Sequence, residues 1–172
     1  GAHLKSAVAL GIGRSVYVGQ HVGDLDTPSA RKAHARAMRD LVHLYEQSPT
    51  VVATDMHPDY ASTSEAHRFA NELASGGCEP TIVEVQHHYA HVLSCMADNG
   101  IEGSVLGVAW DGTGLGPDGT VWGGEFLLTR PRDFVRAAHL RPFRLPGGER
   151  AMREPQRSAA GLLFEIFHAD AP

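Results

Sequence analysis

Three histidines lie within five positions of the chain, at His87, His88 and His91 in the stretch VQHHYAH. If this stretch is helical, His87 and His91 are one turn apart on the same face, which is the spacing that lets two imidazoles bind one metal ion. His88 then points about 100° away and faces something else. Two histidines do not complete a coordination sphere, so a metal site needs a third ligand. Without one, the pair is equally well explained as histidines that make ordinary hydrogen bonds.

Asp111 is the natural third ligand. It ends an expected strand and opens the glycine-rich stretch DGTG, where a carboxylate is accessible to a ligand. Its alternative role is to cap a turn. Missing side chains let backbone N–H groups approach an anion, so Gly112, Thr113 and Gly114 are candidates for binding a phosphate, with the Thr113 hydroxyl as a further donor. A glycine-rich hairpin turn is the other explanation of this tetrapeptide.

Two further places have the same ambiguity. Lys5, at the head of the first expected hairpin, carries a charge that could neutralise a phosphate, although most such lysines are only solvated. Gly123 and Gly124, in the stretch WGGE, remove two side chains from an expected strand. Their absence indicates close approach by another backbone or by a ligand. We therefore add Lys5, Gly123 and Gly124 to the candidate phosphate-binding residues.

A second polar cluster consists of Asp55, His57 and Asp59, directly after an expected strand. Proteins of the α/β class bind ligands at the ends of their strands, but an ordinary polar loop around a proline has the same composition. Cys95 follows His91 by four positions on the expected helix. Because cysteine is commonly a small buried hydrophobe, we expect Cys95 to be buried.

These residues need a scaffold in which strands and helices alternate. Apolar residues recur at helical spacing after Pro28, with Thr27 available as the N-cap, and Gly100 ends the helix that holds the histidines. Short β-branched runs bounded by glycine or proline predict the strands. The expected strands cover residues 6–10, 15–20, 50–54, 81–85, 104–110 and 120–128. The expected helices cover residues 28–45, 65–73, 85–100 and 154–167.

This order of elements predicts an α/β fold with two lobes. One hairpin, with its turn at residues 11–14, opens the chain, and a second hairpin follows the histidine helix. Because each hairpin starts a group of elements, the order indicates an internal duplication. We expect a first lobe over residues 1–100 and the beginning of a second lobe over residues 101–172.

Composition excludes several classes of protein. The 172 residues carry a formal net charge of −5, and no basic run resembles a nucleic-acid footprint, so nucleic acid is not an expected partner. Two cysteines without a CxxC pair exclude a disulfide framework and a cysteine zinc site, and they favour the reducing cytoplasm. No apolar run approaches the roughly 18 residues of a membrane helix, so we expect no membrane association.

Six stretches of the chain, taken together, resemble one family. In order they are GAHLKS, VGQHVGDL, TDMHPDY, VQHHYAH, WDGTGLGPDGTVWGGEFLL and LPGGERAMREPQR, and they extend across nearly the whole chain. They resemble the threonylcarbamoyl-transferase-like domain of the HypF carbamoyltransferases of nickel-iron hydrogenase maturation. The resemblance implies a fold of the actin, hexokinase and chaperone-ATPase superfamily, in which two ribonuclease-H-like lobes each open with a hairpin that touches phosphate.

The resemblance also implies a reaction. In that family an upstream domain makes carbamoyladenylate from carbamoyl phosphate and ATP, and this domain transfers the carbamoyl group to the C-terminal cysteine of the partner HypE. The product is a thiocarbamate, which is later dehydrated toward the cyanide ligand of the hydrogenase iron. Transfer of this kind implies carbamoyladenylate as the nucleotide substrate and a HypE-like protein as the acceptor.

The family's HxxxH metal motif falls on His87 and His91, and its DGTG phosphate loop falls on Asp111–Gly114. The resemblance therefore implies that His87 and His91 bind a catalytic divalent metal, and we keep Asp111 as the third ligand that its position indicates. Two imidazoles and a carboxylate suit iron and zinc about equally, so the identity of the metal stays open.

The ends of the chain depart from a complete family member. The chain begins with glycine and stops just after an apolar helical pattern, so we expect a piece of a larger protein without the upstream domains and with an unfinished second lobe. The remaining metal-binding aspartate and much of the adenosine pocket are then expected outside the chain. We expect no turnover by the chain alone, and we expect an exposed apolar face that favours self-association.

Two other functions compete with this one. An antibiotic-type O-carbamoyltransferase resembles the same domain but delivers the carbamoyl group to a small-molecule hydroxyl. The stretches HPDY and LPGG resemble HypF more closely. A non-catalytic lobe that docks a partner is the third possibility, and it predicts that His87→Ala leaves metal content and activity unchanged.

Overall fold

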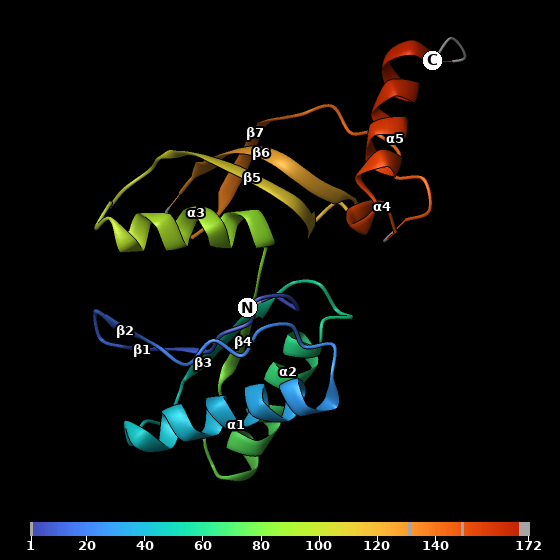
Figure 1. Cartoon of the computed structure of the whole chain (residues 1–172). Helices are drawn as coiled ribbons and strands as arrows, with labels where there is room; N and C mark the ends of the chain where they lie inside the picture. The colour runs from blue at the N-terminus through green and yellow to red at the C-terminus, as the bar shows by residue number, and fades with distance from the viewer. Residues whose placement is uncertain (1, 131, 149, 169–172) are drawn as a thin grey trace. The chain divides into compact units, whose positions relative to one another are not determined.

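The structure is a computed structural model that describes residues 2–130, 132–148 and 150–168 (Figure 1). The described residues form two compact units. Unit 1 extends to Ala90 and also contains Leu115–Gly119, while unit 2 contains His91–Gly114 and the described residues from Thr120 onwards. Both units mix helices with strands, as the sequence predicts for an α/β fold.

Unit 1 opens with an antiparallel hairpin of β1 (Ala9–Ile12) and β2 (Ser15–Val18). Gly13 in the turn has a φ of +60°, a left-handed conformation that glycine adopts without steric cost. Pairing continues to Ile12 opposite Ser15, so the turn is tighter than the predicted one at residues 11–14. The first strand therefore lies later in the chain than the predicted residues 6–10, because it pairs up to the turn.

A strand–helix–strand arrangement follows the first helix of unit 1. The first helix is α1 (Pro28–Leu44), and the arrangement consists of β3 (Val51–Asp55), α2 (Ala61–Ser75) and β4 (Thr81–Val85). The N-cap prediction is confirmed, because the Thr27 hydroxyl accepts the N–H of Ala30 at 3.2 Å. Helix α2 begins at Ala61, one turn before its predicted start at residue 65. Strands β3 and β4 pair in parallel with Asp55 opposite Val85, so their carboxyl ends meet at one edge.

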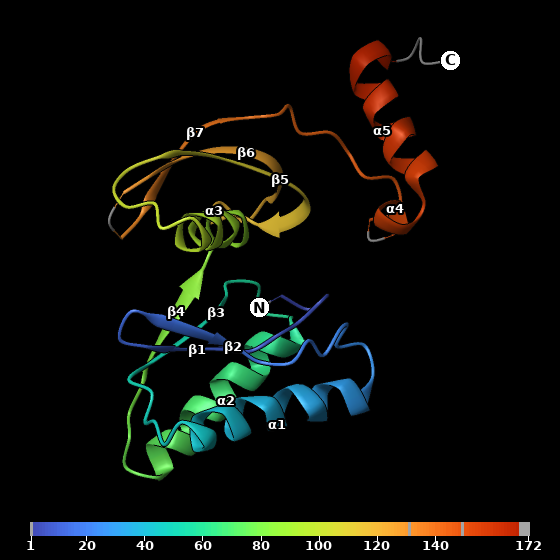
Figure 2. The ribbon, with the colours of Figure 1, turned by 60° about the vertical axis from the view of Figure 1, so that its left-hand side comes forward.

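The core of unit 1 lies between its helices and β3. Helices α1 and α2 are side by side in both views (Figures 1 and 2). Asp55 is further held by the Thr63 hydroxyl of α2, which donates to the Asp55 carbonyl oxygen at 3.1 Å. Packing therefore fixes the end of β3, where Asp55 lies. The buried core residues are Met38, Val52, Ala66, Phe69 and Ala70, with Val8, Val42, Leu73 and Ile82 packed against them.

Helix α3 (His87–Asp98) begins in unit 1 and continues into unit 2. The Gln86 side chain caps it, because its Oε1 accepts the N–H of Tyr89 at 2.9 Å. Gly100, with a φ of +61°, follows its last turn as predicted. The histidines at positions 87 and 91 therefore do lie on one helix.

The sheet of unit 2 has the strand order β5-β6-β7. Its strands are β5 (Leu106–Leu115), β6 (Val121–Thr129) and β7 (Phe134–His139), and two helices follow, α4 (Arg150–Arg153) and α5 (Pro155–Phe167). Helix α3 lies along β5 in both views (Figures 1 and 2). A Cβ added at Gly107 of β5 would lie 2.4 Å from a γ-carbon of Val92, so the glycine allows α3 to approach the strand this closely.

Three features of unit 2 differ from the sequence-based prediction. Strand β7 and the short helix α4 were not predicted. The stretch DGTG was expected in a loop, but β5 continues through Leu115. Glycine is intrinsically disfavoured in strands, but here the pairing of β5 with β6 outweighs this disadvantage. Among the described residues, no helix is both long and apolar enough to cross a membrane.

Candidate functional site

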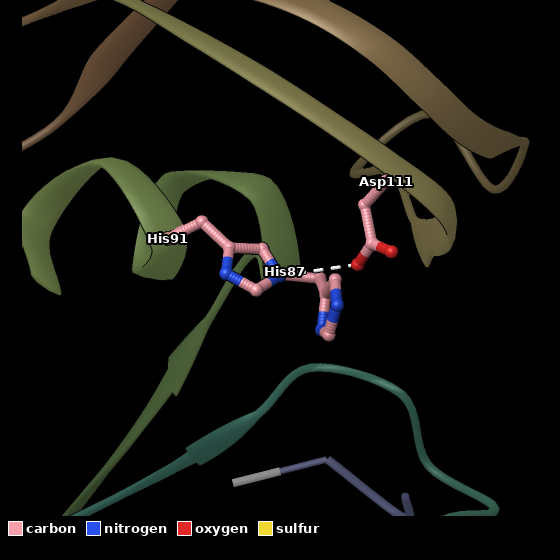
Figure 3. A group of neighbouring side chains, drawn as sticks. All are labelled: His87, His91 and Asp111. Atoms are coloured by element: carbon pink, nitrogen blue, oxygen red, sulfur yellow. Dashed lines mark hydrogen bonds and ion pairs between the residues drawn. The ribbon is translucent and has the colours of Figure 1, made fainter. Parts of the chain in front are cut away.

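Helix α3 and strand β5 present the residues of the predicted metal site. His91 Nε2 lies 3.1 Å from Asp111 Oδ2, which joins the helix to the strand (Figure 3). His87 lies one helical turn before His91 on α3. The side chains of His91 and Asp111 are 56% and 39% exposed, so both are accessible to a ligand.

The donor atoms of these side chains fit a metal ion. One ligand atom from each of His87, His91 and Asp111 lies within 4.8 Å of the other two (Figure 3). Ligand atoms at about 2.0–2.2 Å from one ion lie no more than about 4.4 Å apart, so small side-chain rotations bring all three within reach of one ion. Two imidazole nitrogens and one carboxylate oxygen are a donor set that suits iron or zinc.

Asp55 fixes the first histidine of this pair. His87 Nδ1 lies 2.8 Å from Asp55 Oδ2, and the His57 N–H donates to Asp55 Oδ1 at 2.9 Å. Burial by itself raises the pKa of the Asp55 carboxyl, but the hydrogen bonds from His87 and His57 outweigh burial and lower the pKa below its ordinary value. Asp55 is therefore ionised at neutral pH, with its Oδ2 within hydrogen-bond distance of His87 Nδ1.

The sequence did not predict the contact between Asp55 and His87. It placed Asp55 in a separate polar cluster, although a signal was present in the order of the elements. Parallel pairing sets Asp55 opposite Val85, and His87 follows Val85 by two positions. The other two members of the polar cluster make local contacts: His57 stacks on Tyr60 with ring centroids 4.2 Å apart, and its Nδ1 accepts the Asp59 N–H at 3.2 Å.

His88 has a structural environment. It is fully buried, and its Nδ1 lies 3.1 Å from Gln86 Nε2. The same amide nitrogen donates to the Leu115 carbonyl oxygen at 3.2 Å. His88 thus belongs to the hydrogen-bonded start of α3 and faces away from the predicted metal ligands, as the helical spacing indicates.

The predicted phosphate-binding residues lie in different elements. Gly112, Thr113 and Gly114 are in strand β5, so the expected loop geometry is wrong for this tetrapeptide. The Thr113 hydroxyl lies 3.7 Å from the Met152 sulfur. Lys5 is exposed in unit 1, and its backbone N–H donates to Asp24 Oδ1 at 2.9 Å. Their roles in binding phosphate stay predictions.

The stretch WGGE has a packing explanation of its own. The Gly123 N–H donates to Glu125 Oε1 at 3.1 Å, and a Cβ on Gly124 would lie 2.7 Å from Leu140 Cδ1. Glu125 is 1% exposed and accepts two bonds from Arg136, at 2.6 and 2.9 Å. The Arg136 guanidinium lies 4.0 Å from the ring centroid of buried Trp122. The contact with Leu140 accounts for Gly124 without a ligand, and the phosphate roles of Gly123 and Gly124 stay predictions.

The prediction that Cys95 is buried is wrong, because the residue is exposed. It lies one turn after His91 on α3, and both residues are exposed to solvent. The i, i+4 spacing from His91 indicated the shared face, whereas the general preference of cysteine for the interior did not apply.

Comparison with known proteins decides the family. Residues 1–98 match the family model described as the HypF Kae1-like domain, and residues 107–172 match the model described as the second subdomain of the Kae1-like domain of carbamoyltransferase. The chain belongs to the HypF Kae1-like domain family. Membership confirms the actin-like α/β fold implied by the sequence resemblance.

Individual relatives agree with this family. Carbamoyltransferase HypF of Synechocystis is 44% identical over 171 residues, which are 99% of this chain and 21% of the relative. The crystal structure of T. kodakarensis HypF matches with a TM-score of 0.89 at 34% identity, covering 99% of this chain and 22% of that one. A full-length HypF crystallised in the phosphate- and nucleotide-bound form matches with a TM-score of 0.83 at 37% identity, covering 96% and 21%. The chain thus spans about a fifth of the length of these relatives.

Proposed function

We propose that this HypF-type chain carries a carbamoyl-transfer site, which moves the carbamoyl group of carbamoyladenylate to the C-terminal cysteine of a HypE-like acceptor protein. The observation that carries the proposal is the pairing of His91 with Asp111 at 3.1 Å, one helical turn from His87, in a chain of this family. Carbamoyl phosphate and ATP are consumed in the preceding step, which other domains of the full-length protein perform.

In the proposed reaction the acceptor thiolate attacks the carbonyl carbon of the carbamoyl group. A carbon–sulfur bond forms, the bond from this carbon to the phosphate oxygen breaks, and AMP leaves with the electron pair. His87, His91 and Asp111 would hold a divalent iron or zinc ion, whose charge would polarise the phosphate and make AMP a better leaving group. The chain's own side chains thereby orient the phosphate against the attacking sulfur.

Phosphate contacts complete the proposal. Gly112, Thr113 and Gly114 follow Asp111 in β5, and in this proposal their backbone N–H groups would contribute to binding the phosphate. In this proposal Lys5 supplies a further positive charge that neutralises the phosphate. A relative of the same fold was crystallised with phosphate and nucleotide, which supports a phosphate-binding role in this family. The acceptor needs a free thiol, which agrees with a reducing cytoplasmic location.

The test uses the full-length protein with carbamoyl phosphate, ATP and the acceptor protein. His91→Ala and His87→Ala should each lose bound metal and abolish carbamoylation of the acceptor's C-terminal peptide, followed by mass spectrometry. His67→Ala is the matched control, because His67 is a 46% exposed histidine of α2 outside the site, and it should keep both properties.

Three results would contradict the proposal. Full transfer by His91→Ala would remove the metal site from the mechanism and favour a docking lobe. Transfer to a small-molecule hydroxyl instead of the acceptor cysteine would favour an O-carbamoyltransferase. Efficient transfer by the 172-residue chain alone, supplied with carbamoyladenylate and acceptor, would overturn the requirement for the rest of the protein.

A further inference from the structure

We propose that Asp55 is a positioning residue that holds His87 in one tautomer, with the proton on Nδ1 and the metal-binding lone pair on Nε2. The inference rests on the proposed metal site and deepens it. Asp55 touches neither substrate nor metal in this proposal, and it acts only through His87.

The hydrogen bonds of the Asp55 carboxylate determine the tautomer. Asp55 Oδ2 lies 2.8 Å from His87 Nδ1, and an ionised carboxylate can only accept. His87 must therefore donate from Nδ1. A neutral imidazole that donates from Nδ1 carries its lone pair on Nε2, which is the nitrogen then presented to an ion.

The carboxylate itself is held in place. Its second oxygen, Oδ1, accepts the His57 N–H at 2.9 Å, so the carboxylate is bonded through both oxygens. Its backbone is held as well, because the Thr63 hydroxyl donates to the Asp55 carbonyl oxygen and the Met56 N–H donates to the Val85 carbonyl oxygen at 3.2 Å. Rotation of the Asp55 side chain away from His87 would also break the hydrogen bond from the His57 N–H.

Burial favours the hydrogen bond between Asp55 and His87 over hydrogen bonds from either side chain to water. The side chains of Asp55 and His87 are 5% and 15% exposed, whereas those of Asp111 and His91 are 39% and 56% exposed. The two histidines of the HxxxH pair therefore differ. His87 is oriented before an ion arrives, while His91 is more exposed and faces Asp111, which is itself a candidate ligand.

The experiment measures the tautomer directly and the metal affinity separately. Long-range proton–nitrogen NMR correlations of ¹⁵N-histidine-labelled, metal-free protein at about pH 8, above the usual imidazole pKa, show which ring nitrogen of His87 carries hydrogen. His87→Gln identifies the resonances. Zinc affinity is measured by competition with a chromophoric chelator for the wild type, Asp55→Asn and the control Asp98→Asn, which changes an exposed aspartate of α3.

We expect hydrogen on Nδ1 of His87 in the wild type and a mixture of tautomers in Asp55→Asn. Zinc affinity should fall about 10–100-fold in Asp55→Asn, the usual effect of losing a carboxylate behind a metal-binding histidine, and stay unchanged in Asp98→Asn. Hydrogen on Nε2 in the wild type, or unchanged affinity in a folded Asp55→Asn, would overturn the inference.

The wild-type tautomer needs no variant, so it decides the question even if Asp55→Asn fails to fold. It also separates this inference from the proposed metal centre. If the wild type binds no zinc or iron, the metal centre is refuted, while hydrogen on Nδ1 of His87 would still assign Asp55 its positioning role.

Discussion

Adding one methyl group at Gly107 should separate α3 from β5. The Cβ of alanine would lie 2.4 and 2.5 Å from the two γ-carbons of Val92. Carbon atoms in contact are about 3.5–4.0 Å apart, so helix or strand must move by about 1 Å. Overpacking of this kind costs about 2 kcal/mol. Because His91 precedes Val92, the same movement lengthens the 3.1 Å contact to Asp111 and should weaken zinc binding.

A double-mutant cycle with Val92→Ala separates the clash from other effects. Val92→Ala alone removes two buried methyl groups, worth about 1.5 kcal/mol at roughly 0.8 kcal/mol each. The double variant keeps the residue-92 Cβ, 3.0 Å from the added Cβ, so most of the clash is relieved and the coupling should be about 1–2 kcal/mol. Gly112→Ala is the control in the same strand, because its Cβ would meet nothing within 4 Å.

The assay is urea unfolding followed by tryptophan fluorescence. Both tryptophans, Trp110 and Trp122, lie in unit 2, and Trp122 is only 3% exposed, so its emission reports the packing of that unit. Equal unfolding midpoints for Gly107→Ala and Gly112→Ala would refute the packing argument. Additive losses in the double variant would show that Val92 is not what the added methyl meets.

Three further predictions concern other contacts. Thr27→Ala should lower the free energy of unfolding by about 1 kcal/mol in urea titrations, because α1 loses its N-cap, and Thr27→Ser should restore it. Arg136→Met should cost about 3 kcal/mol or more, because buried Glu125 loses its ion pair, and adding Glu125→Gln should recover stability if that charge is the cause. The hydrogen bond from Arg39 lowers the pKa of Glu72, so its stabilisation is present above about pH 4.5 and is lost as the pH falls through the lower folded-state pKa. Wild type and Glu72→Gln should therefore differ by less than about 1 kcal/mol near pH 7 and converge in acid, and a gap that persists at acid pH would contradict this assignment.

Local patterns in the sequence predicted the helical part of the site. The spacing of His87 and His91 and the glycine at position 100 are properties of neighbouring residues, and helix α3 has them as expected. Thr27 before Pro28 likewise predicts the start of α1 from a contact within one turn. Patterns that involve only neighbouring residues predict structure reliably because they do not depend on which strands pair.

Contacts between distant segments were not predictable in the same way. The partner of His87 depends on the parallel register of β3 and β4, which no local pattern around Asp55 specifies. The strand conformation of Gly112 likewise depends on its neighbour β6. At Gly124 the missing side chain leaves room for Leu140, a residue too distant in sequence to be inferred as its neighbour. A glycine in a strand predicts that another group lies close to it, but the sequence does not show which group that is.

The distance along the chain between Asp55 and His87 has a consequence for metal loading. They are 32 residues apart and meet only when the parallel strands have paired across α2. Before that step, an ion meets a chain with 11 histidines and no oriented pair. Pairing of distant strands is slow compared with helix formation, so the order of addition matters during refolding. If His87 belongs to the proposed metal centre, an ion supplied after folding should find an oriented ligand, whereas an ion supplied earlier should bind histidines that the native state keeps apart.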